Sequence, residues 1–338
     1  MYRNKLKSVI MLLIILFSVS CKKDKERVPY EYLALLFYGQ TPACSTSGAF
    51  HYYGANNQIS EHYRSIDGSC WSKYTPSILV DYMDYGNGVF VAVHSYNSSF
   101  SNKISHSTDG INFTETTYPA TSKLGRVKFI NKKFYIYQSG SLSLIKSADG
   151  INWTKPAQTN LGANTISDLT GYSSGATNYL IAFSSRGGCI LISTDDAETW
   201  TVKSYNNLLR GGATVAAGTS AIVVTNQTGN SVLTSADSGV TWKQNTFTSP
   251  RKAWNINGKF YVYGDSADIT SSSAPLSSSS DGNTWATVKT FDHYYDIYHL
   301  VVSGTGRLVT PAYYSDDGTN WIKSTSFEKP ITYMMYVP

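Results

Sequence analysis

The stretch that repeats most clearly in this chain is Ser235-Ala236-Asp237-Ser238-Gly239-Val240-Thr241-Trp242. Its pattern is a Ser, an Asp two residues later, a turn and then an aromatic residue, and it recurs six more times. The steps between successive aspartates are 42, 40, 46, 42, 44 and 36 residues. These aspartates are Asp67, Asp109, Asp149, Asp195, Asp237, Asp281 and Asp317. A fixed period of this length is typical of solenoids, propellers and other repeat folds.

Each part of the repeat has a mechanical reason. The Ser and the Asp are two residues apart, so they lie on the same face of an incoming strand. The Asp can accept hydrogen bonds from N–H groups of a tight turn, and a Gly allows the positive φ that the turn needs. The aromatic ring then packs against neighbouring strands. In the fourth repeat Ala197 stands where Gly is expected, which predicts strain of about 1 kcal/mol. We therefore interpret the seven aspartates as structural residues.

This pattern resembles the Asp-box, or BNR, repeat of sialidases and many other β-propellers, over residues 30–338. The resemblance implies that each turn joins the third and fourth strands of a blade and faces away from any active site. Strand patterns between the turns agree with this, for example residues 126–130 and 133–137 around Asn131-Lys132. We predict an all-β fold, a seven-bladed β-propeller of four-stranded antiparallel blades.

The two ends of the propeller predict how the ring closes. Residues 331–337 follow the seventh turn and resemble a first strand, whereas residues 30–38 resemble a second strand. We therefore expect the C-terminal strand to become the innermost strand of the first blade. That arrangement leaves no open edge in the ring.

The chain begins with a segment that we place outside the fold. Three cations precede an apolar run at residues 9–17, which is too short to span a bilayer and fits a signal peptide over residues 1–20. Residues 17–21 resemble a bacterial lipobox, which implies cleavage before Cys21 and lipid attachment to its thiol. Ordinary secretion with an incidental Cys is the alternative. Residues 21–29 form a charged tether similar to those of Bacteroidetes-type lipoproteins. We expect the protein to be exported and lipid-anchored to the cell envelope, at the outer membrane or on its surface.

Charge and composition exclude several classes of function. The formal net charge of +5 falls to +2 without residues 1–20, since they carry Arg3, Lys5, Lys7 and no acid. No basic run or nucleic-acid motif is present, so we predict no nucleic-acid partner. The six His residues are scattered, and no Cys/His cluster has the spacing of metal ligands. We predict neither a metal site nor a cofactor.

Three cysteines remain beyond Cys21. Cys44 and Cys70 both fall within the first repeat and could pair in an oxidising compartment. Cys189 follows a Gly pair into a strand, and we interpret it as a small buried hydrophobic residue.

The loops on the face opposite the turns form the candidate binding site. Arginine is suited to bidentate capture of a carboxylate, and aromatic rings beside arginines suit sugar rings. The candidate ligand-binding residues are Arg126, Arg186, Arg210, Arg251, Trp254, Asp292, His293, Tyr294 and Tyr295, and Lys252 falls in the same region.

Two classes of function fit this site. The first is a surface module that binds a glycan or a protein, as seven-bladed photosystem assembly factors act as binding scaffolds. The second is a glycoside hydrolase that resembles sialidases and acts on an acidic glycan. Sialidases hold the substrate carboxylate with three Arg and use a Tyr nucleophile, a Glu and an Asp. The nearest match to their R-I-P motif, Arg27-Val28-Pro29, lies in the tether, and no Tyr–Glu pair emerges. The sequence favours the binding module and assigns no catalytic residue.

Overall fold

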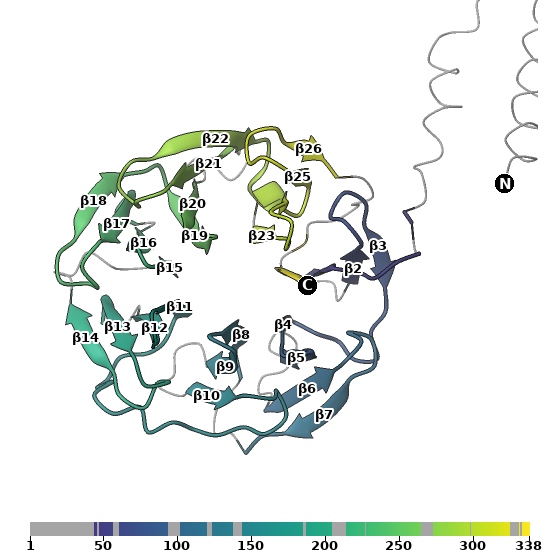
Figure 1. Ribbon diagram of the computed structural model, residues 1–338, viewed down its shortest axis with the longest axis horizontal. Helices are drawn as coiled ribbons and strands as arrows, with labels where there is room; N and C mark the ends of the chain where they lie inside the picture. The colour runs from purple at the N-terminus through teal and green to yellow at the C-terminus, as the bar shows by residue number, and fades with distance from the viewer. Residues whose placement is uncertain are drawn as a thin grey trace, which may run out of the picture. The chain divides into compact units, whose positions relative to one another are not determined.

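Seven antiparallel sheets follow one another around a ring, coloured in chain order in Figure 1. The structure, a computed structural model, describes residues 44–338 except 46, 57–60, 94–101, 120–123, 138–143, 185–186, 205–213, 227, 265–272, 298, 325–330 and 332. For Asn56, Ser204, Tyr294 and Tyr295 it describes the backbone only. The predicted signal peptide, the predicted tether and Cys21 lie outside the described residues.

The sheets are numbered as blades one to seven, each read from its innermost strand outward. Blade one contains β27 (Tyr333–Tyr336), β1 (Tyr52–Asn56), β2 (Glu61–Ser65) and β3 (Ser72–Tyr74). Blade two contains β4 (Tyr82–Gly86), β5 (Val89–Val93), β6 (Lys103–Ser107) and β7 (Thr114–Thr117). Blade three contains β8 (Arg126–Ile130), β9 (Lys133–Tyr137) and β10 (Leu144–Ser147). Blade four contains β11 (Asp168–Ser174), β12 (Thr177–Ser184), β13 (Cys189–Ser193) and β14 (Thr201–Ser204).

The second half of the chain repeats the same plan. Blade five contains β15 (Val215–Ala217), β16 (Ile222–Asn226), β17 (Ser231–Ser235) and β18 (Lys243–Thr246). Blade six contains β19 (Pro250–Ile256), β20 (Lys259–Gly264), β21 (Ala274–Ser279) and β22 (Ala286–Phe291), and the 3-10 turn η1 (Tyr294–Ile297) follows it. Blade seven contains β23 (Val301–Val302), β24 (Leu308–Val309), β25 (Tyr313–Ser315) and β26 (Ile322–Lys323). The predicted seven-bladed β-propeller is confirmed.

The seven repeats, called here the Ser-Asp turns, join the third and fourth strands of the blades as predicted. In each turn the Ser hydroxyl accepts the N–H of the residue at positive φ, over 2.7 to 3.0 Å. These residues have φ between 70° and 82°; they are Gly68, Gly110, Gly150, Ala197, Gly239, Gly282 and Gly318. Each Asp accepts at least one N–H of the turn that follows it. The left-handed conformation predicted for Ala197 is therefore confirmed.

Ring closure follows the prediction, with one correction. β27 pairs antiparallel with β1, and the Val337 N–H donates to the His51 carbonyl over 2.6 Å. The prediction for the second strand of blade one was wrong, because β1 takes that place and residues 30–38 lie outside the described part of the chain. The ring is closed by its own C-terminal strand.

Blade three departs from the other blades at its outer edge. Its fourth strand is reduced to one bridge, in which Lys146 and Thr154 exchange backbone hydrogen bonds of 2.9 Å. Pro156 follows two residues later and has no N–H to continue a ladder. The chain then forms a parallel bridge between Thr159 and Thr199 of blade four.

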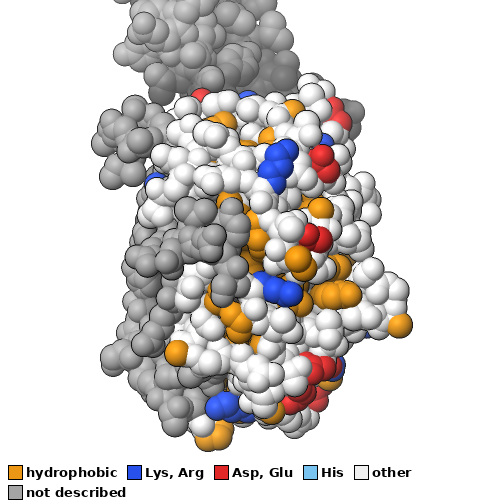
Figure 2. Space-filling model, turned by 90° about the vertical axis from the view of Figure 1, so that its left-hand side faces the viewer, with side chains coloured by type: hydrophobic (Ala, Val, Ile, Leu, Met, Phe, Trp, Pro, Cys, Tyr) orange, Lys and Arg blue, Asp and Glu red, His pale blue; other side chains and the backbone are white. Residues whose placement is uncertain are grey.

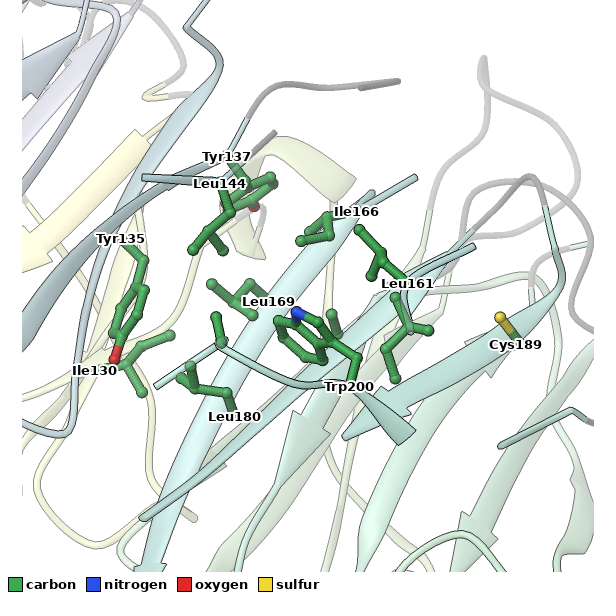
Figure 3. Packing of buried hydrophobic residues seen from close by; sticks show 13 residues of the cluster. Ile130, Tyr135, Tyr137, Leu144, Leu161, Ile166, Leu169, Leu180, Cys189 and Trp200 are labelled. Atoms are coloured by element: carbon green, nitrogen blue, oxygen red, sulfur yellow. The ribbon is translucent and has the colours of Figure 1, made fainter. Parts of the chain in front are cut away.

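The core lies between adjacent blades. Figure 3 shows the cluster between blades three and four, where Tyr135 and Tyr137 of β9 face Leu169 and Leu180 across the blade interface, with Trp200 beside Leu169. All these side chains are buried. The aromatic residue that ends a Ser-Asp turn therefore contributes to inter-blade packing, as Trp200 does here.

The cysteines behave as the sequence suggested. Cys44 and Cys70 form a disulfide with a Cα–Cα distance of 5.5 Å. Cys189 is a free, buried cysteine whose thiol lies 3.3 Å from the Asn164 carbonyl oxygen Oδ1. No helix in the described ranges is long and apolar enough to cross a bilayer.

Candidate functional site

A cavity of about 870 Å³ lies among the innermost strands at the centre of the ring. All seven blades contribute to its wall, through β4, β8, β11, β15, β19, β23 and β27 together with residues that directly precede them. This volume is within the range of small-molecule sites. On the outer side of the molecule shown in Figure 2, Lys, Arg, Asp and Glu side chains are interspersed with hydrophobic and uncharged ones.

The strand pleat explains which side chains line the cavity. Alternate residues of a strand point to one side, so charged residues recur two positions apart or beside an aromatic residue. Examples are Arg126 with Lys128 on β8, and Lys252 with Trp254 on β19. Innermost strands start on the face opposite the Ser-Asp turns, because strands alternate in direction along each blade. Charged residues at their starts therefore lie toward that face.

Lys128 and Asp168 form an ion pair in the cavity wall. The Lys128 Nζ lies 2.7 Å from Asp168 Oδ1 and also donates to the Leu169 carbonyl over 2.6 Å. The Tyr137 hydroxyl donates to Asp168 Oδ1, and the Val215 N–H donates to Oδ2 over 3.0 Å. Burial by itself would raise the pKa of Asp168, but the charge and hydrogen bond of Lys128 outweigh it and lower the pKa. The pair thus joins blades three, four and five.

Asp84 is the second carboxylate of the wall. Its Oδ1 accepts the Tyr85 N–H over 2.8 Å, and its Oδ2 accepts the Phe129 N–H of blade three over 2.7 Å. Burial raises the pKa of Asp84 to about 6, although these hydrogen bonds and the charge of Lys128 act against that rise. Both oxygens of Asp84 are therefore hydrogen-bonded, and Oδ2 joins blade two to blade three.

Arg126 and Tyr82 lie together in the wall. The guanidinium carbon of Arg126 is 5.3 Å from the centre of the Tyr82 ring, within cation–π range. Burial disfavours the charge of Arg126, but Tyr137, Tyr82 and Asp168 outweigh it, so the pKa of Arg126 is raised. This guanidinium is therefore a fixed positive charge in the cavity.

Lys252 has a different electrostatic environment. Its Nζ lies 3.3 Å from His299 Nε2 and 6.0 Å from the centre of the Trp254 ring. Burial, together with the positive charge of Arg126, lowers the pKa of Lys252 to about 7. Lys252 therefore changes its charge near neutral pH, unlike Arg126.

The structure brings some of the predicted site residues together and separates others. Arg126 and Trp254 line the cavity, and so does Lys252. Arg251, Asp292 and His293 are not among its lining residues, and Asp292 and His293 are exposed. Arg186 and Arg210 lie outside the described residues, as do the side chains of Tyr294 and Tyr295.

A β-bulge explains why Lys252 rather than Arg251 faces the cavity. On β19, Pro250 pairs with Gly264 and Lys252 pairs with Tyr263, so Arg251 is the extra residue. A bulge changes the direction in which the following side chains point. Sequence reasoning also missed Lys128, Asp84, Asp168 and His299. Alternation of charged residues at the starts of innermost strands was the signal that could have identified the first three.

No group of three or more His, Cys, Asp and Glu side chains is placed to hold a metal ion among the residues that the structure describes. The wall of the cavity presents charged and aromatic side chains, such as Arg126, Asp168 and Trp254.

Comparison with known families supports the fold. Residues 84–210 match the family model of the DUF6242 beta propeller domain, which covers blades two to four. The chain is a seven-bladed propeller. None of the curated proteins matches it at a significant level.

Solved structures resemble the chain in fold at low sequence identity. A streptogramin B lyase aligns with a TM-score of 0.57 and 13% identity, over 80% of this chain and 88% of its own. A provisionally assigned 6-phosphogluconolactonase from Bacteroides uniformis aligns with a TM-score of 0.59 and 9% identity, over 85% and 99%. YCF48 bound to D1 peptide aligns with a TM-score of 0.50 and 14% identity, over 71% and 78%. At such identities the likeness shows the fold alone, and the resemblance to the Asp-box family stays a prediction.

Proposed function

We propose that this protein is a lipid-anchored binding protein of the cell envelope whose ligand, a glycan or a protein segment, places an anionic group in the central cavity. The observation that carries this proposal is the charge of the cavity wall. Among its described residues, Arg126, Lys128 and the protonated form of Lys252 face two carboxylates, Asp84 and Asp168. Gathering like charges in one concavity has a cost that an anionic ligand offsets.

The hydrogen bonds that the two carboxylates already accept favour a role in binding over a role in catalysis. Both oxygens of Asp84 and both oxygens of Asp168 accept hydrogen bonds from the blades that they join. A general acid or base has to exchange protons with a substrate, and these groups are already committed to backbone N–H groups and to Lys128. Their geometry fits the maintenance of a rigid cavity.

Glycoside hydrolysis of an acidic glycan is the alternative. In its favour, the pKa of Asp84 is raised and that of Asp168 is lowered, which is the division expected of an acid and a base. A fluorogenic sialoside tests this alternative. Turnover that disappears in Asp84→Asn, with the fold intact by circular dichroism, would replace the binding proposal by the enzymatic one.

The membrane anchor rests on the lipobox resemblance at Cys21. Cys21→Ser should move the protein from the membrane fraction to the soluble fraction, since lipid attachment requires that thiol. Metabolic labelling with a palmitate analogue is the direct measurement. Label that persists in Cys21→Ser would contradict the anchor and leave ordinary secretion.

The ligand is best sought with the soluble Cys21→Ser protein. Arrays of acidic glycans and a library of carboxylate-bearing peptides are the probes, and the peptide-bound state of YCF48 supports the inclusion of peptides. Arg126→Ala should weaken binding by about tenfold or more, because it removes a charge-assisted contact. Lys103→Ala on β6 is the matched control, since Lys103 is an exposed residue paired with Glu115 outside the cavity. Equal affinity of the Arg126→Ala and Lys103→Ala variants would reject the cavity as the binding site.

A further inference from the structure

Lys252 is presented to the central cavity by an irregular strand. The bulge between Pro250 and Lys252 places its side chain in the wall beside Trp254, with His299 Nε2 at 3.3 Å from Nζ. Bulges are frequent next to active sites, where they redirect a side chain. At this position a lysine amine, which can act as a nucleophile, lies beside an imidazole that can carry a proton. Both line a cavity large enough for a small molecule.

The surroundings of Lys252 favour the neutral amine. Among the described residues that line the cavity, the charged or titratable side chains include Arg126, Lys128, Asp168, Asp84 and His299. Burial and the cations Arg126 and Lys128 lower the pKa of Lys252 to about 7, with Asp168 opposing the shift. At pH 7 about half of the molecules then carry Lys252 as a neutral amine, whereas an ordinary lysine is almost entirely an ammonium ion. A neutral amine in such an environment is the form that attacks carbonyl groups.

We propose that Lys252 captures the carbonyl group of a small oxo acid in the central cavity as a reversible imine, with Arg126 holding the carboxylate of that ligand. This inference goes beyond the proposed binding function, because the imine requires only the amine and a carbonyl compound. Imine formation at Lys252 can therefore be tested without the glycan or protein ligand.

The chemistry needs no oxidant or reductant. The Nζ lone pair attacks the carbonyl carbon, a C–N bond forms, and the carbonyl oxygen takes a proton to give a carbinolamine. The nitrogen then loses its remaining proton as the C–O bond breaks, and one water molecule leaves. His299 is placed to accept the proton from nitrogen and to return it to the departing hydroxyl group. The products are one imine and one water for each amine and carbonyl consumed.

Lys128 provides an internal control in the same cavity. It lies 2.7 Å from Asp168, whose charge outweighs the effect of burial and raises the pKa of Lys128. Lys128 therefore remains an ammonium ion at pH 7 and should not react, although the same cavity exposes it to the same ligands.

The test traps the imine with sodium cyanoborohydride. The Cys21→Ser protein is incubated with glyoxylate at pH 7, and the adducts are located by peptide mass spectrometry. Lys252 should be modified about tenfold or more faster than Lys128 and the exposed Lys103, with a rate that rises through pH 7. Modification of Lys252 at or below the rate of Lys103 would overturn the proposal.

Variants separate the two parts of the proposal. Lys252→Arg should abolish the fast adduct, and the comparison of lysines within the unaltered molecule decides the matter if this variant does not fold. Propionaldehyde, which has no carboxylate, should react with Lys252 more slowly than glyoxylate, and Arg126→Ala should remove this preference. Equal rates for the two aldehydes in the protein with Arg126 intact would contradict the role of Arg126. Because propionaldehyde tests the amine without any anion, failure of the anionic-ligand proposal leaves a distinguishable result.

Discussion

At the scale of single residues, the Ser-Asp turns act as local staples. Asp149 accepts the N–H groups of Ile151 and Asn152 at 2.9 and 2.8 Å, and its other oxygen accepts the Asn152 amide. Ser147 accepts the Gly150 N–H in the same turn. Because these contacts all lie within the turn, the carboxylate has a structural use that needs no ligand.

Asp149→Ala should lower stability without changing the central cavity. The lost acceptor leaves N–H groups that water can partly satisfy, so we expect a decrease in the free energy of unfolding of roughly 0.5–1.5 kcal/mol. Denaturant unfolding measures this change. Asp149→Asn is the matched control, since an amide oxygen still accepts the N–H groups, and it should lose less. Altered glyoxylate capture at Lys252 in a folded Asp149→Ala protein would contradict a purely local role.

Ala197 and Gly150 occupy the same position in two different turns, and exchanging Ala and Gly there should have different effects. Ala197→Gly relieves about 1 kcal/mol of left-handed strain but removes a buried methyl group worth a similar amount, so the melting temperature should change little. Gly150→Ala adds strain at φ 75° and brings a Cβ within 2.5 Å of the Val91 side chain. It should destabilise the protein by about 2–3 kcal/mol. Thermal melts compare the two variants, and a loss of similar size in both would show that methyl packing dominates at Ala197.

At the scale of elements, ring closure depends on a short strand from the end of the chain. β27 covers the edge of β1, and Met334 and Met335 of β27 are buried. The adjoining Ile331 is also buried, and an added Cβ on Gly54 would lie 2.8 Å from its side chain. The last strand of the chain is therefore joined to the first strands by main-chain pairing within blade one and by close packing, whereas neighbouring blades are joined by side chains such as Asp84 and Asp168.

A chain that ends at residue 330 should lose cooperative unfolding. This truncation removes β27, which exposes the N–H and C=O groups of β1 and opens the ring. We therefore expect a broadened thermal transition and association of the open edges. Size-exclusion chromatography and circular dichroism measure both effects. A chain that ends at Val337 keeps β27 and is the control. A sharp, unshifted transition in the shorter chain would show that the other blade interfaces suffice.

The strands illustrate what sequence could and could not predict. The intervals 126–130 and 133–137 coincide with β8 and β9, because a turn of two residues between alternating strands is a local signal. The shortened edge of blade three was missed, although Pro156 marks it. The cavity was only partly predicted, because its wall assembles strands that are far apart in the chain. A single bulge also decides that Lys252, and not Arg251, faces inward.

At the scale of the whole molecule, the seven Ser-Asp turns should make the free energy of unfolding depend on pH in the acid range. Burial acts to raise the pKa of all seven aspartates and is the largest single cause at Asp67 and Asp195. The hydrogen bonds that the carboxylates accept, with the charge of Arg307 at Asp67, outweigh it and lower the pKa of all seven. The unfolded chain, with ordinary pKa values, therefore binds more protons as the pH falls below about 4. The contribution of these aspartates to the free energy of unfolding should be constant above about pH 5. It should decrease progressively between about pH 4 and pH 2.

Asn substitutions at Asp149 and Asp281 should reduce this acid dependence. An Asn keeps an oxygen acceptor for the turn N–H groups but does not titrate in this range, so each substitution removes up to one proton from the difference between the unfolded and folded chains. Denaturant unfolding at closely spaced pH values between 2 and 5 gives the slope directly. The double variant should show a shallower slope than the unaltered protein, at low salt and at about 1 M salt alike, because the hydrogen bonds are local whereas general charge repulsion is screened at about 1 M salt. An unchanged slope in the double variant would mean that other carboxylates, such as those of the cavity wall, govern acid unfolding.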